Sequence, residues 1–169
     1  MALFAVDIDN LHELFVEQLR DLYDGEQQIT EALPKLIEKA NNPRLKNTLE
    51  EHLNVTRTQI KRLDEIFQAL GEKPTGETCK GMKGVLKEGD DLVSKVKDPG
   101  IIDASIIASA QRVEHYEMAG YGTVRSFARL LGRQEFAELL DQTLGEEKEA
   151  DAMLTQISDA VNVEADRAA

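Results

Sequence analysis

Six side chains that can bind a metal ion interrupt the apolar stripes of an otherwise helical sequence pattern. They are Glu26, His52, Glu114, Glu117, Glu147 and Asp151. Glu114 and Glu117 are three residues apart, and Glu147 and Asp151 are four apart. Both spacings place two side chains on the same face of an α-helix. Since apolar residues stand on both sides of these positions, the pattern predicts a polar layer halfway along an apolar core.

Buried carboxylates are costly unless they are paired or bound to a cation. Hard oxygen ligands with some imidazole nitrogen suit iron or manganese. We therefore expect a carboxylate-bridged dinuclear centre that holds iron, with manganese as the second choice. The structural alternative is an internal network in which Arg62, Arg112 or Arg125 neutralises the acids and no metal binds.

Four long helices must position these residues, and the apolar spacing predicts them at about 10–40, 43–70, 101–131 and 134–161. Asn10 is suited to cap the first helix, Pro43 suits the first turn of the second, and Gly71 and Gly132 suit helix ends. Residues 71–100 form a long crossover, within which residues 78–96 are amphipathic enough for a short extra helix.

The short connections near residues 41–42 and 132 make each pair of long helices an antiparallel hairpin. Two hairpins joined by one long crossover are typical of a ferritin-like four-helix bundle. The predicted fold is therefore all-α, with a single domain over residues 1–169. Counting back from each hairpin turn brings the polar residues of the four helices to a similar height.

The chain has 169 residues, with 32 acidic and 20 basic side chains and a formal net charge of −12. This surplus argues against nucleic acid or an anionic membrane as a partner, because both select a cationic surface. No apolar run is long enough for a membrane span and no secretory signal is visible, so we expect a cytoplasmic protein. Cys79 is the single cysteine, which excludes an internal disulfide and a multi-cysteine zinc site.

Several segments resemble the YciE/YciF family of bacterial ferritin-like stress proteins. The carriers are LRDLYDGEQQITEALPKL (19–36), HLNVTRTQIKRLDEIFQALGEKP (52–74), TCKGMKG (78–84), QRVEHYEMAGYGTVR (111–125) and LGEEKEAD (144–151). The resemblance covers nearly the whole chain. It implies a rubrerythrin-like helical fold, a homodimer, a role in the bacterial stress response and a dinuclear iron site built from the six residues named above.

The chain departs from the usual ferritin-like ligand pattern, in which two helices each carry Glu-x-x-His. Leu49 stands three residues before His52, and Ala150 stands three residues after Glu147. A site with one histidine is therefore richer in oxygen than most. The first expected function is a dinuclear metal-binding stress protein that reacts with dioxygen or peroxide. The alternative is a non-enzymatic, dimeric stress or structural protein without bound metal.

Overall fold

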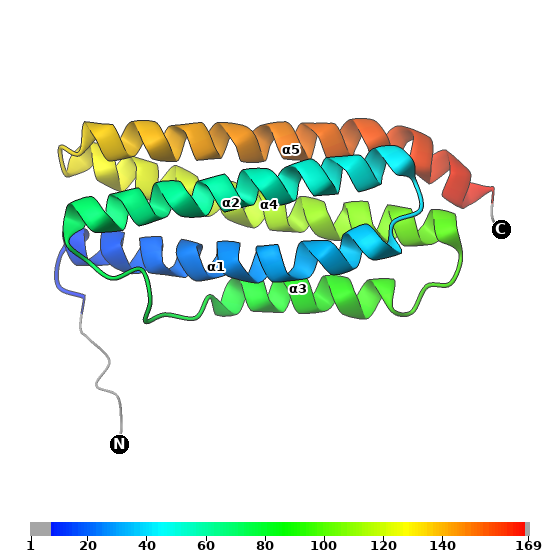
Figure 1. Cartoon of the computed structure of the whole chain (residues 1–169), viewed down its shortest axis with the longest axis horizontal. Helices are drawn as coiled ribbons and strands as arrows, with labels where there is room; N and C mark the ends of the chain where they lie inside the picture. Colours follow the sequence, from blue (N-terminus) through cyan, green and yellow to red (C-terminus); the bar gives the residue numbers. More distant parts are fainter. Residues whose placement is uncertain (1–7, 168–169) are drawn as a thin grey trace, which may run out of the picture.

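A computed structural model describes residues 8–167 of the chain, which fold into five helices (Figure 1). The helices are α1 (Leu11–Lys39), α2 (Pro43–Leu70), α3 (Lys80–Val93), α4 (Pro99–Leu130) and α5 (Gln134–Asp166). No strand occurs among these residues. The predicted all-α class is confirmed.

Local capping explains where several helices begin and end. The side chain of Asn10 accepts a hydrogen bond from the backbone N–H of Glu13, and Asn42 and Asp98 cap α2 and α4 in the same way. A proline follows each of the last two caps, where its missing N–H costs nothing. Gly71 ends α2 with a φ of +70°, a backbone conformation that favours glycine.

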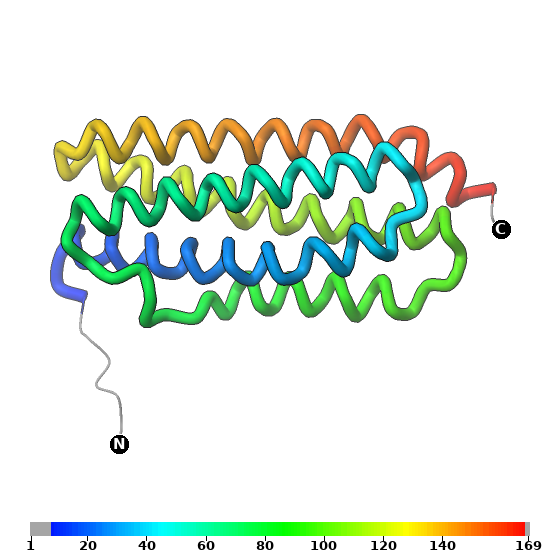
Figure 2. Tube along the Cα trace, in the orientation of Figure 1, coloured from blue at the N-terminus to red at the C-terminus, as the bar shows by residue number. Residues whose placement is uncertain are grey.

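The long helices form two antiparallel hairpins, α1–α2 and α4–α5, which pack side by side (Figure 1). Because α2 and α4 run in the same direction, the chain between them must travel the length of the bundle (Figure 2). Helix α3 makes most of this journey along the outside of α1 and α4. The crossover therefore adds a fifth helix to one side of the bundle.

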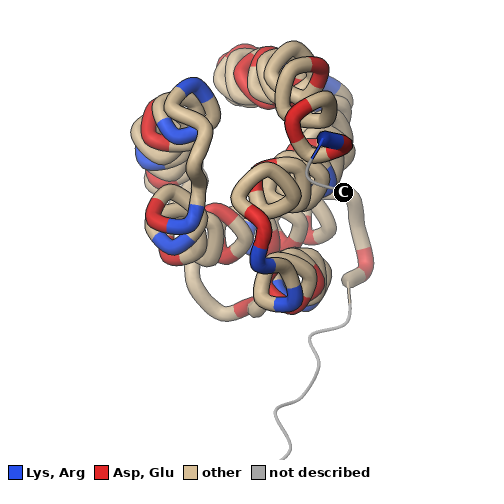
Figure 3. Tube along the Cα trace, turned by 90° about the vertical axis from the view of Figure 1, so that its right-hand side faces the viewer, with Lys and Arg blue, Asp and Glu red and all other residues tan. Residues whose placement is uncertain are grey.

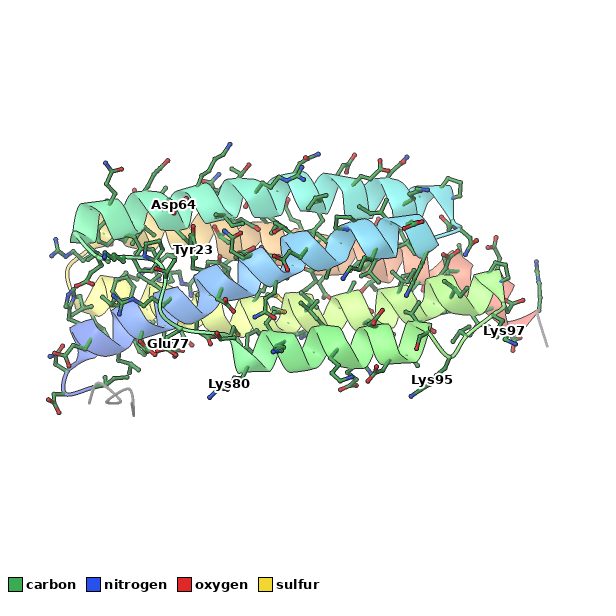
Figure 4. All side chains as sticks on the ribbon, turned by 60° about the horizontal axis from the view of Figure 1, so that its bottom comes forward. Tyr23, Asp64, Glu77, Lys80, Lys95 and Lys97 are labelled. Carbon is green, nitrogen blue, oxygen red and sulfur yellow. The ribbon has the colours of Figure 1, made fainter. Side chains whose placement is uncertain are left out.

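Helix α3 presents one face to the bundle and the other to solvent. Met82, Gly89 and Val93 are its buried residues. Lys80, just at its start, and Lys95 and Lys97, just after its end, are exposed and point away from the bundle (Figure 4). This amphipathic character is what the composition of residues 78–96 predicted.

The last helix runs to Asp166, whereas the apolar pattern predicted an end near residue 161. Val161 is buried in the core. Closer to the end of α5, the backbone of Ala165 lies near Gly100 on α4. A Cβ atom added to Gly100 would be 3.3 Å from it, so the end of α5 packs closely on the start of α4. This tertiary contact supports a last turn that its own sequence marks only weakly.

Two apolar clusters fill the interior, one toward each end of the bundle. One contains Ile29, Leu33, Leu45, Leu49, Ile107 and Leu154 among others, and the second contains Phe15, Leu19, Leu63, Ile66, Val124 and Leu140 among others. Along each long helix, buried polar residues stand between members of the two clusters: Glu26 on α1, His52, Thr56 and Gln59 on α2, Glu114 and Glu117 on α4, and Glu147 on α5. The predicted alternation of apolar, polar and apolar levels is thus present.

Every helix carries acidic residues, as the view along the bundle in Figure 3 shows. Most are exposed or half-buried, whereas Glu26, Asp103, Glu114, Glu117 and Glu147 are buried. Asp103 has a structural partner, since it accepts hydrogen bonds from the backbone of the α1–α2 turn at Asn41 and Asn42. Within residues 8–167, no helix is both long and apolar enough to cross a membrane.

Candidate metal centre

Four buried side chains from three helices converge at the middle of the bundle. One ligand atom from each of His52, Glu114, Glu117 and Glu147 lies within 4.8 Å of the others. Helix α2 supplies the imidazole, α4 supplies two carboxylates one turn apart, and α5 supplies the last carboxylate. We call these four residues the ligand cluster. Its dimensions suit a metal ion held between these side chains.

Helix α1 contributes Glu26 to the edge of the ligand cluster. The side chain is buried, and its Oε1 accepts a hydrogen bond from the hydroxyl of Tyr121 on α4. Glu26 also lies close enough to Glu117 and Glu147 to interact electrostatically with their carboxylates, which links it to the cluster. The structure therefore brings together five of the six predicted residues.

The sixth predicted residue, Asp151, lies outside the group of four. Its side chain is 23% exposed, and Oδ1 accepts a hydrogen bond of 3.0 Å from Gln111. The Nε2 atom of His115 lies 3.5 Å from the same oxygen, on a side chain that is 65% exposed. Asp151 therefore belongs to a polar group at the bundle surface, although it stands one turn beyond Glu147.

Neutral donors, rather than arginines, contact the clustered carboxylates. Gln59 on α2 donates a hydrogen bond from Nε2 to Oε1 of Glu147, and Tyr121 donates to Glu26. Neither Gln59 nor Tyr121 is among the site residues that the sequence pattern predicts. Their part in orienting the carboxylates emerges only when the helices pack.

The three arginines that could have neutralised the cluster pair with other acids. Arg62 donates to both carboxylate oxygens of Glu146, at 2.6 and 2.7 Å. Arg125 pairs with Asp141, and Arg112 lies 4.0 Å from Glu88. Within the described part of the chain, none of the three arginines therefore forms an ion pair with the clustered acids, as the alternative network would require.

Burial strongly perturbs the ionisation of the cluster. It raises the pKa of Glu26, Glu114 and Glu117 well above the ordinary value, and repulsion from neighbouring carboxylates adds to the rise. Burial also raises the pKa of Glu147, to about 7. It lowers the pKa of His52 to about 4. The imidazole is therefore neutral at pH 7, so its 3.5 Å approach to Glu114 is not an ion pair, and a neutral imidazole is the form that binds metals.

Unpartnered atoms also point to a missing cation. The Oε2 atoms of Glu26, Glu114, Glu117 and Glu147 and the Nε2 atom of His52 are buried without a hydrogen-bond partner. Such atoms are rare in folded proteins, because each costs about 1–3 kcal/mol when left unsatisfied. All five carry lone pairs available for a metal ion. The donor set therefore fits a cation with mixed oxygen and nitrogen ligands.

Comparison with known proteins agrees with this architecture. Residues 10–166 match the family model described as Domain of unknown function (DUF892). Protein YciF of Escherichia coli strain K12 is 35% identical over 154 residues, which cover 90% of this chain and 93% of YciF. The alignment therefore spans the helices that carry the ligand cluster.

Solved structures extend the comparison to three dimensions. The E. coli stress protein YciF superposes with a TM-score of 0.88 over 91% of this chain and 98% of its own. YcfI of Rhodopseudomonas palustris, suggested to be a structural protein, is 45% identical with a TM-score of 0.87 over 90% of this chain and 97% of its own. A ferritin-like, diiron-carboxylate protein of Bacillus anthracis shares the fold at 16% identity, with a TM-score of 0.70 over 89% and 99% of the two chains.

The five-helix arrangement, the match over nearly all described residues and the similarity to YciF lead to one conclusion. This chain belongs to the DUF892 family, and its fold is ferritin-like.

Proposed function

We propose that the protein binds a dinuclear metal centre, with iron as the metal and manganese as the alternative, and that it serves in bacterial stress. The observation that carries the proposal is the set of buried, unpartnered ligand atoms in and beside the ligand cluster. Glu26, His52, Glu114, Glu117 and Glu147 would hold the metal, with Asp151 as an outer carboxylate. The similarity to the stress protein YciF supports the physiological role.

The side chains of this protein have clear parts in such a centre. The carboxylates of Glu114, Glu117 and Glu147 are close enough to bridge two cations, and His52 offers a neutral nitrogen. Gln59 and Tyr121 orient the carboxylates by hydrogen bonds, as outer partners of metal ligands commonly do. The apolar clusters on both sides exclude water. Iron held there would supply electrons to dioxygen or peroxide.

The metal content of the purified protein tests the proposal. Protein from iron- or manganese-supplemented medium should contain near-stoichiometric metal by elemental analysis. The double substitution Glu114→Gln with Glu147→Gln removes two buried charges of the cluster and should weaken metal affinity by at least ~10-fold, the usual cost of disturbing ligands or their partners.

A matched control is the double substitution Glu135→Gln with Glu149→Gln, which removes two exposed charges from α5, the helix that carries Glu147. This variant should retain the metal. Loss of metal from both variants, or from neither, would contradict the proposed ligands.

A second candidate function is a dimeric structural protein of the stress response without metal. It is favoured by the hydrogen bonds that Glu26 and Glu147 already receive, and by the structural role suggested for YcfI. It predicts no metal-dependent change in melting temperature, whereas a bound centre stabilises the folded state by mass action. Thermal melts with and without Fe²⁺ or Mn²⁺ separate the two functions.

We also propose that the protein is a cytoplasmic homodimer, as the resemblance to the YciE/YciF family implies. Light scattering on the purified chain tests the dimer directly, and a fluorescent fusion in the native bacterium tests the location. A mass equal to one chain at micromolar concentration would overturn the dimer.

A further inference from the structure

A small apolar cavity adjoins the ligand cluster. It has a volume of about 30 Å³, and its walls come from all five helices. Leucine, isoleucine, valine and alanine side chains make up most of the lining, and the polar members are Thr48, His52 and Glu114. Two of these three belong to the ligand cluster, so the cavity reaches the metal-binding side chains themselves.

The cavity lies where a more usual ferritin-like protein would carry further ligands. Leu49 and Ala150 both line it. They occupy the positions at which a Glu-x-x-His motif would place a glutamate on α2 and a histidine on α5. Replacing these polar side chains by an apolar and a small one leaves room beside His52 and Glu114.

A larger groove outside the bundle leads to the cavity. This groove lies between α1, α3 and α4, has a volume of about 240 Å³, and carries charged side chains such as Lys35 and Lys83 at its rim. Five residues line both the groove and the cavity: Ala32, Leu36, Leu86, Ala110 and Val113. These side chains, to which α3 contributes Leu86, therefore form a common wall of the cavity and the groove.

We propose that the inner cavity is a binding pocket for dioxygen, reached from the groove past Leu86. Its volume is sufficient, since about 10–15 Å³ already holds a molecule the size of water. Apolar walls favour a neutral molecule without hydrogen-bonding groups. Water or peroxide would find polar partners only at Thr48, His52 and Glu114, and a metal ion in the ligand cluster would occupy the last two. Anions would be repelled by the carboxylates of the cluster.

The occupancy of the pocket does not depend on bound metal, whereas the role of dioxygen as a reactant rests on the proposed function. The dioxygen pocket and the metal-binding function can therefore be disproved independently of each other. Dioxygen binding without metal uptake would leave the pocket and remove the metal function, and metal uptake without dioxygen binding would do the reverse.

Nuclear magnetic resonance of the full chain under pressurised oxygen tests the pocket, with the protein metal-free or loaded with diamagnetic zinc. Dioxygen is paramagnetic and speeds the relaxation of nearby protons. The methyl groups of Leu49, Val113 and Leu154, which line or adjoin the cavity, should relax several-fold faster than those of Leu63 and Val124 in the other apolar cluster. Equal relaxation in the two sets would overturn the proposal.

Ala110→Leu adds a side chain to the cavity wall and should abolish the excess relaxation. Its control is Ala108→Leu, an exposed position two residues away on α4, which should leave the effect intact. If Ala110→Leu does not fold, Ala150→Leu fills the cavity from α5 instead. A folded cavity-filling variant that keeps the full effect would refute the pocket.

The route is tested by the exchange of xenon, an apolar and somewhat larger probe. Leu86→Ala removes part of the wall between groove and cavity and should speed the exchange of bound xenon several-fold. The control Leu92→Ala shortens an exposed leucine of the same helix and should not change it. Equal exchange rates in Leu86→Ala and the unsubstituted protein would exclude this entrance.

Discussion

At the scale of single residues, the hydroxyl of Tyr121 has an unusually demanding position. It is buried and donates its hydrogen bond to Glu26. Tyr121→Phe keeps the ring and leaves another carboxylate oxygen unpartnered. We expect the free energy of unfolding of the metal-free protein to fall by about 1–3 kcal/mol, measured by urea denaturation.

Tyr23→Phe is the matched control for this substitution. Its ring packs edge-on against Phe67, while its hydroxyl lies beside Asp64 at the bundle surface (Figure 4). We expect Tyr23→Phe to change the free energy of unfolding by no more than about 0.5 kcal/mol, as most surface substitutions do. Similar losses in the two variants would mean that the hydrogen bond to Glu26 has no special weight.

At the scale of elements, the packing of α3 depends on a glycine. A Cβ atom on Gly81 would lie 2.6 Å from Cε2 of Tyr116, a ring whose hydroxyl is held by Cys79 and Asp21 at 3.2 and 3.3 Å. We expect Gly81→Ala to lower the unfolding free energy by about 1 kcal/mol, because overpacking outweighs the gain in helix propensity.

Gly84→Ala tests this explanation on the same helix. No atom lies within 4 Å of a Cβ added there, so the substitution should show the propensity gain alone, a stabilisation of up to about 1 kcal/mol. Thermal denaturation of the two variants should therefore shift in opposite directions. Stabilisation by Gly81→Ala would show that Tyr116 moves aside without cost.

At the scale of the whole molecule, the buried carboxylates should make stability depend on pH in an unusual direction. Burial raises the pKa of Glu147 from 4.5 to about 7, and that of Glu26, Glu114 and Glu117 well above the ordinary value. Above pH 4.5 the unfolded chain ionises while the folded chain stays protonated. Each group therefore costs about 1.4 kcal/mol of stability per pH unit until its folded pKa is reached.

The histidine acts in the opposite sense but is outnumbered. Burial lowers the pKa of His52 from 6.5 to about 4. As pH falls through that interval, the unfolded chain binds a proton that the folded chain does not, so this histidine lowers the free energy of unfolding. Because four carboxylates oppose one imidazole, the metal-free protein should be less stable at pH 7 than at pH 5. The free energy of unfolding in urea, with a chelator present, measures this difference. Stability that rises over this range would contradict the raised pKa values.

Bound metal should reverse the trend, because the cation competes with protons for the same carboxylates and binds more tightly as pH rises. The difference in melting temperature between metal-loaded and metal-free protein should therefore grow from about pH 5 to about pH 7. A constant difference would show that metal binds away from these carboxylates.

The sequence by itself determined the helical class, most helix boundaries and the polar level inside the core. These features depend on spacing along one chain, where the 3.6-residue period, the caps and the glycines act locally. Glu114, Glu117 and Glu147 could be recognised because each interrupts an apolar stripe. Leu49 and Ala150 could be recognised from the sequence as departures from the Glu-x-x-His pattern. That they line a cavity could not.

Only the tertiary structure decided which of these side chains meet. Asp151 shares a helix face with Glu147, yet in the packed bundle its side chain lies beside Gln111 of α4 and is partly exposed. The pairing of Arg62 with Glu146 and the contacts of Tyr121 and Gln59 join residues far apart in sequence. Such contacts depend on how helices are rotated and set against each other, which no periodicity within a single helix encodes.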